Sequence, residues 1–202
     1  MSECGKLPKL LSLQLRDGTE VVARPLSPDD REGLADGYRL LSPEARYQRF
    51  WVRGGDVISA STLDRLLNTD GSNHAIWAIL DRSRDYPGLG AASYWRSKTN
   101  PTDAEFSVTV LDSEHGRGIG TLLLAILWIH AYQSGIETLT GYVMPENQQA
   151  IDWMCDTGAD GHWDGYQAIF KWRLGDVSSL PMTAAAGDLA QWLAELTPES
   201  DC

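Results

Sequence analysis

The chain has 202 residues, a formal net charge of −11 and a hydrophobic fraction of 43%. This length predicts one domain with a sizeable core, and the acidic balance argues against a nucleic-acid partner. No apolar run is long enough to cross a bilayer, and residues 1–6 lack the pattern of a signal peptide, so we expect a cytoplasmic protein without a membrane partner.

The first 70 residues predict a β-hairpin followed by three helices. A serine followed by a proline begins each of the first two helices, at Ser27-Pro28 and Ser42-Pro43. We interpret Arg46 and Arg49, on the second helix, as solvated side chains rather than substrate contacts. The hairpin strands are expected at residues 10–15 and 21–25 and the helices at 27–41, 42–50 and 59–67.

The remainder of the chain predicts strands around one long helix at residues 118–133. This helix is apolar on nearly every face and should therefore be buried. Six strands are expected, at residues 74–80, 88–95, 104–111, 138–143, 161–163 and 168–173, with a helix from 145 to about 155 before the last two.

The C-terminal part predicts a short amphipathic helix at residues 184–196. Leu189, Trp192, Leu193 and Leu196 share one face, which predicts docking on the core of the same chain or on a partner chain. We therefore divide the chain into a domain at residues 1–175 and an acidic linker with a short helix at 176–202. A monomer and a homodimer both fit this pattern.

Three glycines stand between the strand at 104–111 and the long helix. The segment is His115-Gly116-Arg117-Gly118-Ile119-Gly120-Thr121. Glycines let a ligand approach the backbone amides closely, and a helix start adds unpaired N–H groups and the positive end of its dipole. Strand, loop and helix start together predict an anion site, most often for phosphate.

Two common phosphate motifs do not fit this loop. A Walker A loop ends in Gly-Lys-Ser/Thr, whereas Gly118 is followed by Ile119 and Gly120. A dinucleotide-binding loop has the spacing Gly-x-Gly-x-x-Gly and an acidic residue about 20 positions later. The spacing here is Gly-x-Gly-x-Gly, and the next strand ends in Val-Met-Pro.

The segment from Val108 to Gly120 resembles motif A of the GNAT superfamily of acyl-CoA N-acyltransferases. That motif is Gln/Arg-x-x-Gly-x-Gly/Ala after a strand, and His115 stands where Gln or Arg is usual. The resemblance implies that the amides of residues 115–121 hold the pyrophosphate of coenzyme A. It also implies that the backbone of Val108, Thr109 and Val110 pairs with the pantetheine arm, with Val110 N–H donating to the thioester carbonyl.

A second resemblance extends over residues 10–174. The segments 17–30 and 41–50, Ala-Glu-Phe-x-Val-x-Val at 104–110 and Pro-Glu-Asn at 145–147 are similar to the catalytic domain of bacterial protein lysine acetyltransferases. This resemblance implies the GNAT fold, an α/β (α+β) arrangement. Its sheet would be mixed, mostly antiparallel, of about seven strands flanked by helices, with a V-shaped split after the fourth strand and an extra C-terminal helix.

Acyl transfer to an amine needs a base, because an ammonium group has no lone pair. Glu105 is the candidate: strand alternation places it, Ser107 and Thr109 on the face opposite Phe106, and the family resemblance implies the same role. Asn147 is expected to contact the pantetheine arm, to cap the following helix, or to do both. Counted from Asn147, Met154 stands where many relatives carry a tyrosine acid, so the thiolate leaves unaided or Tyr142 or Tyr166 protonates it.

These residues predict an acetyl-CoA-dependent N-acetyltransferase that acts on a primary amine, either a protein lysine or a small molecule. The alternative is a CoA-binding regulatory module with little or no turnover, which the departures at His115 and Met154 keep open. A succinyl donor is disfavoured because no carboxylate-binding cation is evident around Val108 and Leu111. No metal is expected, since the three cysteines and four histidines are scattered.

Overall fold

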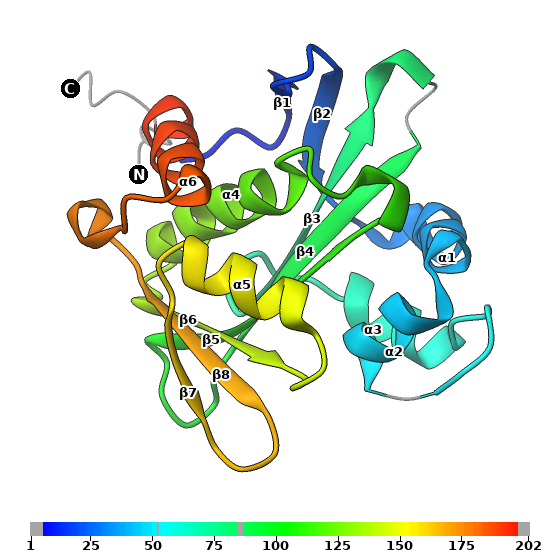
Figure 1. Cartoon of the computed structure of the whole chain (residues 1–202). Coiled ribbons are helices and arrows are strands. Elements are labelled where there is room, and N and C mark those ends of the chain that lie inside the picture. Colours follow the sequence, from blue (N-terminus) through cyan, green and yellow to red (C-terminus); the bar gives the residue numbers. More distant parts are fainter. Residues whose placement is uncertain (1–5, 52, 85–86, 198–202) are drawn as a thin grey trace.

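The computed structural model describes residues 6–51, 53–84 and 87–197, so two of the three scattered cysteines, Cys4 and Cys202, lie outside the described residues. One mixed sheet runs through the molecule with helices on both faces (Figure 1). Its spatial order is β1-β2-β3-β4-β5-β6-β8-β7. The strands are β1 (Leu11–Gln14), β2 (Glu20–Pro25), β3 (His74–Asp81), β4 (Gly88–Arg96), β5 (Asp103–Val110), β6 (Thr138–Val143), β7 (Asp160–Trp163) and β8 (Ala168–Arg173).

Helices form where the sequence predicts them. Serine hydroxyls cap two of them: Ser42 Oγ accepts from Ala45 N–H and Ser59 Oγ from Thr62 N–H, both at 3.1 Å. Short 3₁₀ turns η1 (Pro28–Asp30), η2 (Arg82–Arg84), η3 (Asp112–Glu114) and η4 (Val177–Ser179) complete the connections. The helices are α1 (Arg31–Leu40), α2 (Pro43–Phe50), α3 (Ala60–Leu67), α4 (Ile119–Gln133), α5 (Gln148–Asp156) and α6 (Ala184–Leu196).

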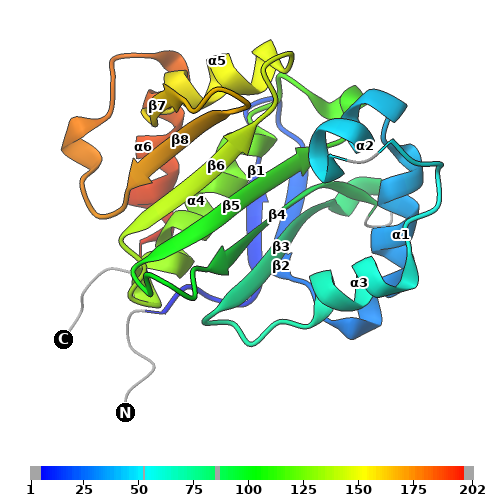
Figure 2. The same ribbon diagram turned by 90° about the horizontal axis from the view of Figure 1, so that it is seen from below.

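The predicted mostly antiparallel sheet is confirmed, with β5 and β6 as its parallel pair (Figure 2). Two details differ from the expectation. The sheet has eight strands rather than the about seven that the resemblance implies, and β1, the expected first strand of the hairpin, lies at its edge and pairs with β2. The split therefore follows the fifth strand: β5 and β6 pair only up to Phe106 and Gly141, whereas β5 continues to Val110.

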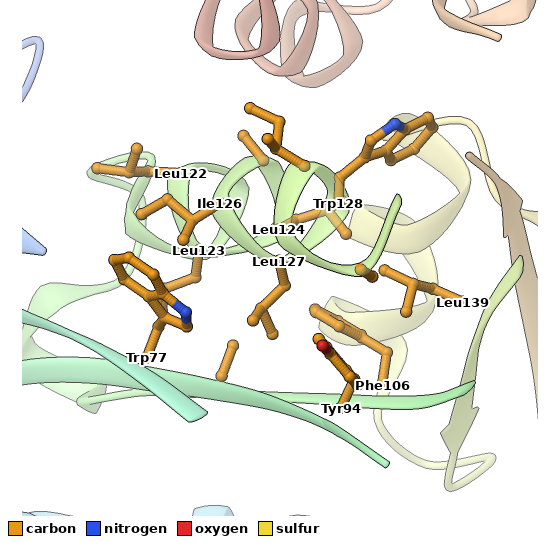
Figure 3. Packing of buried hydrophobic residues seen from close by; sticks show 14 of the residues in the cluster. Trp77, Tyr94, Phe106, Leu122, Leu123, Leu124, Ile126, Leu127, Trp128 and Leu139 are labelled. Carbon is orange, nitrogen blue, oxygen red and sulfur yellow. The ribbon is translucent and has the colours of Figure 1, made fainter. Parts of the chain in front are cut away.

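Helix α4 is the centre of the core, as its sequence predicts. Leu122, Leu123, Leu124, Ile126 and Leu127 are completely buried. Figure 3 shows Leu123 and Leu127 between the helix and the sheet residues Trp77, Tyr94 and Phe106, whereas Leu122 lies on the side away from the sheet. Because apolar residues surround the whole helix, α4 needs cover on its other side too.

Helix α6 provides part of that cover. Leu189, Leu193 and Leu196 are buried in the same cluster as α4, and Trp192 packs against it. The C-terminal helix therefore docks on the core of its own chain. The opposite face of the sheet carries α1, α2 and α3 (Figure 2). Within the described residues, no helix combines the length and apolarity needed to span a bilayer.

Replacing Leu189 with alanine should destabilise the protein by about 2–5 kcal/mol, because the substitution leaves a cavity beside α4. The matched control is Leu10→Ala: Leu10 is 62% exposed, and its loss should change the free energy of unfolding by less than about 0.5 kcal/mol. Urea denaturation of both variants measures the two values. Equal effects would contradict the docking of α6.

Candidate active site

The glycine loop enters α4 through two left-handed residues. Gly116 has φ of +76° and Gly118, the residue before α4, has φ of +79°. Residues other than glycine rarely adopt this backbone conformation. A Cβ atom added to either glycine would meet no heavy atom within 4 Å. The loop therefore presents its backbone to open space.

The backbone N–H groups from Gly116 to Thr121 have no hydrogen-bond acceptor among the described residues. The first bond of α4 runs from Leu122 N–H to the Gly118 carbonyl, at 3.0 Å. The unpaired donors therefore comprise the first turn of a helix and the loop before it, where the helix dipole is positive. This arrangement suits a phosphate group.

The Arg117 side chain turns away from this space. Its guanidinium group donates to Asp17 Oδ2 at 2.7 Å and to Thr19 Oγ1 at 2.6 Å, and it pairs with Glu114. The hydrogen bond from Arg117 holds the pKa of Asp17 well below its usual range. Arg117 therefore offers only its main chain to a ligand, and its side chain ties the loop to the β1–β2 turn.

Glu114 extends this connection. Its buried carboxylate also lies 3.3 Å from Arg84, which pairs with Asp81 at 2.5 Å. Alternating charges thus connect the loop with the end of β3. Sequence reasoning missed this chain, because Asp17 and Arg117 are 100 residues apart and no local pattern links them.

The end of β5 has an open edge. Leu111 N–H donates to the Leu89 carbonyl at 3.0 Å, on the β4 side. Since N–H groups alternate along a strand, the N–H groups of Val110 and Val108 face the other side, where pairing with β6 has ended. On that side the Nε2 atom of His115 lies 3.1 Å from the Val110 carbonyl oxygen.

A cavity of about 630 Å³ joins these features. Side chains or backbone from β5, the glycine loop, α4, β6, α5, α2 and α6 line it. The structure brings together at this cavity all the site residues predicted from sequence except Arg117. They are Glu105, Val108, Thr109, Val110, His115, Gly116, Gly118, Ile119, Gly120, Thr121 and Asn147.

Glu105 lies on the exposed face of β5, as strand alternation predicts. Its neighbours Ala104 and Phe106 are buried in the core, whereas Glu105 is exposed and lines the cavity. It pairs with Trp95 of β4 and Thr140 of β6, close to the last pair between β5 and β6. The carboxylate therefore lies where the sheet begins to split.

Two arginines also line the cavity: Arg49 of α2, which is partly buried and not fully solvated as interpreted from sequence, and Arg65 of α3, which the sequence did not indicate. Burial lowers the pKa of Arg49 to about 10; the Glu105 carboxylate opposes this shift and Arg65 adds to it. Arg49 therefore remains a cation at neutral pH. The interpretation of Arg46 as solvated is wrong: it is 9% exposed, with its guanidinium carbon 5.6 Å from the centre of the Tyr38 ring.

The positions considered for a proton donor differ in their access to the cavity. Met154 is buried and lines the cavity, and Tyr142 lines it too. Tyr166 does not line it and is 86% exposed. Burial, with the negative charges of Glu105, Asp103 and Asp164, raises the pKa of Tyr142, so its hydroxyl carries a proton at neutral pH.

Asn147 forms the helix cap predicted for it. Its side-chain oxygen accepts from Ala150 N–H at 3.0 Å and so caps α5, and the residue also lines the cavity. Trp153 of α5 donates to Thr121 Oγ1 at 3.1 Å, which fixes α5 against the start of α4.

A second, largely apolar cavity of about 220 Å³ lies between the sheet and α1, α2 and α3. It shares Arg49, Phe50 and Thr109 with the larger cavity. The Thr109 hydroxyl is buried and has no partner among the residues described. Among all the residues that the structure describes, no group of three or more His, Cys, Asp or Glu side chains is placed to hold a metal ion.

Comparison with known proteins gives a family match over most of the chain. The profile described as "Acetyltransferase (GNAT) domain" matches residues 20–159. Acetyltransferase Pat of Mycolicibacterium smegmatis is 29% identical over 137 residues, which are 68% of this chain and 40% of that protein. Acetyltransferase PA5475 of Pseudomonas aeruginosa is 28% identical over 153 residues, 74% of this chain and 80% of that protein.

Solved structures share the fold. The GNAT domain of S. lividans PAT has a TM-score of 0.76 at 24% identity. That match covers 84% of this chain and 100% of the S. lividans domain. The putative acetyltransferase yncA from Salmonella typhimurium, solved with its cofactor acetyl-CoA, has a TM-score of 0.60 at 17% identity. That match covers 77% of this chain and 95% of yncA.

Gly118→Ala should weaken the binding of coenzyme A at least about tenfold, because a methyl group would enter the space in front of the free amides. Gly71→Ala is the matched control, since Gly71 has φ of +73°, open space around it and no part in the cavity. Both substitutions should cost about 1–2 kcal/mol of stability through backbone strain. Calorimetric titration should separate them; equal affinities would contradict the predicted cradle.

Proposed function

Because the chain belongs to the GNAT acetyltransferase family, we propose that it transfers an acetyl group from acetyl-CoA to a primary amine by direct attack on the thioester. The amine belongs to a protein lysine or to a small molecule. One observation carries the proposal: the free amides of residues 116–121, the open edge of β5 and the Glu105 carboxylate all face one cavity.

The residues of the cavity suit coenzyme A in their order along the cleft. The amides at the start of α4 would accept its diphosphate, because they are unpaired and at the positive end of a helix. The open edge of β5 at Val108 and Val110 would pair with the pantetheine amides as a strand does. The yncA structure contains acetyl-CoA on the same fold, which supports this choice of ligand.

The reaction then requires proton transfers and stabilisation of the charge that develops on the carbonyl oxygen. Glu105 accepts a proton from the acceptor ammonium group, directly or through water, and so frees the nitrogen lone pair. Val110 N–H donates to the carbonyl oxygen as negative charge develops there. The new nitrogen–carbon bond forms, the carbon–sulfur bond breaks, the nitrogen releases its second proton to solvent, and the thiolate takes up a proton.

We assign the donor of that last proton to Tyr142. Tyr142 lines the cavity and has a hydroxyl group, whereas Met154 has no proton to give and Tyr166 lies outside. Its raised pKa keeps the hydroxyl protonated before the thiolate leaves.

Replacing Glu105 with glutamine should lower kcat by about 10²–10⁴-fold, because the amide cannot accept a proton. Affinity for acetyl-CoA should stay within about threefold of wild type, since Glu105 lies away from the free amides. Thiol release and calorimetry measure the two quantities, and Glu137→Gln, an exposed residue outside the cavity, is the control. Wild-type protein that binds coenzyme A but releases no thiol with a panel of amines would instead identify a regulatory module, the role that Met154 favours.

Tyr142→Phe should lower kcat by about 10²-fold and leave the affinity for acetyl-CoA unchanged. Tyr166→Phe, its matched control outside the cavity, should behave as wild type. Stopped-assay measurement of free thiol at several pH values tests this pair. If the two variants have the same kcat, the thiolate leaves without help from Tyr142.

A further inference from the structure

The arginines of this chain fall into two groups by the charges beside them. In a chain of net charge −11, six arginines have a carboxylate partner among the described residues. Arg49 and Arg65 belong to the other group: neither forms an ion pair or a hydrogen bond with another described residue, and both line the larger cavity. The paired arginines are Arg16, Arg24, Arg31, Arg39, Arg84 and Arg117.

Both unpaired guanidinium groups lie beside Glu105. Trp95 is the cross-strand partner of Glu105, so the two side chains share one face of the sheet, about 5 Å apart at Cβ. The guanidinium carbon of Arg65 lies 5.9 Å from the centre of the Trp95 ring. His74 stacks on that ring with its centre 3.4 Å away, which fixes the tryptophan in place. Arg49 reaches the same carboxylate from α2 and lies over the Phe50 ring, 5.1 Å from its centre.

The negative charge of Glu105 lies near these two cations, and the reaction neutralises it. Glu105 becomes neutral when it accepts the proton of the acceptor. Arg49, which is partly buried, then loses the carboxylate charge that favours its cation, while the positive charge of Arg65 remains close to it. Partly buried like charges without a partner are unfavourable. A negative group supplied by the substrate would remove this cost.

We propose that the acceptor carries a carboxylate near its reacting amine and that Arg49 and Arg65 bind this carboxylate. This inference rests on the proposed function and specifies its acceptor. The acceptor class is then an ω-amino carboxylate or a lysine with an acidic neighbour, since the two present the same chemistry. A planar guanidinium group on an aromatic ring is well suited to a carboxylate.

The placement of the two arginines favours the acceptor over the acyl donor as the source of this carboxylate. Arg65 stacks on Trp95, next to the residue that takes the proton of the amine. The free amides of residues 116–121 lie beyond the other end of β5. Arg46 takes no part, because it does not line the cavity and is buried against Tyr38.

The test compares acceptors that differ only in the carboxylate. Butylamine, pentylamine and hexylamine are each paired with the amino acid of the same chain length, 4-aminobutanoate, 5-aminopentanoate and 6-aminohexanoate. A lysine peptide with an adjacent aspartate is paired with its asparagine analogue, which separates the two sources. Thiol release from acetyl-CoA by the full chain gives kcat/KM for each acceptor.

Wild type should favour the carboxylate member of at least one pair by about tenfold or more, the effect of one charged hydrogen bond. In Arg65→Met and Arg49→Gln this ratio should fall to about one. Arg65 is exposed on α3, so its variant should fold, and the unfolding temperature of each variant checks this. Arg82→Gln, exposed and outside both cavities, is the control and should keep the wild-type ratio.

A wild-type ratio near one in every pair, or a ratio that both arginine variants retain, would overturn the inference. So would a preference that appears only with succinyl-CoA as donor. If no amine reacts at all, the proposed function fails separately. Ligand-observed NMR with 5-aminopentanoate then decides: binding that Arg65→Met abolishes supports the carboxylate site, and binding equal in both proteins, or absent from both, rejects it.

Discussion

Unpaired backbone donors are the constraint on which the whole structure depends. Folded proteins pair nearly all of their buried N–H groups, yet here six successive amides at the start of α4 have no acceptor in the described chain. The edge of β5 beyond Phe106 is also without a strand partner. Both sets of donors border one cavity, and a ligand with phosphate and amide groups satisfies them together. The free hydrogen-bond donors that border this cavity are therefore mainly backbone N–H groups.

The rest of the molecule holds these donors in position. Helix α4 is buried on all sides by the sheet and α6, so its N-terminus cannot shift without disturbing the largest part of the core. The ionic connection through Arg117, Glu114 and Arg84 fixes the preceding loop to two separate turns. If these amides bind the diphosphate as proposed, the departure at His115 from the usual Gln or Arg matters less, because rigid amides rather than a side chain would provide the attraction.

Local patterns made much of this predictable. The strand, glycine loop and helix start are contiguous in sequence, and alternation along β5 correctly separates Glu105 from Phe106. Contacts between distant segments were not predictable. The direction of Arg117 depends on a turn 100 residues earlier, and the burial of Arg46 depends on how α2 packs against α1. The split follows the fifth strand and not the fourth, because β1 lies at the edge of the same sheet. The sequence predicts the hairpin that contains β1 but not the position of β1 in the strand order.

The distribution of charge connects binding with chemistry. The chain is acidic overall, yet the cavity holds two unpaired arginines and a row of amide dipoles. An acidic exterior repels coenzyme A, which is itself an anion, so attraction must come from short-range groups inside the cleft. The same exterior attracts a protonated amine. In the proposed function the amine loses its proton beside Glu105, where the nearby guanidinium groups would favour the neutral amine. The acidic surface would then concentrate the acceptor, and the cationic interior would favour the form that attacks.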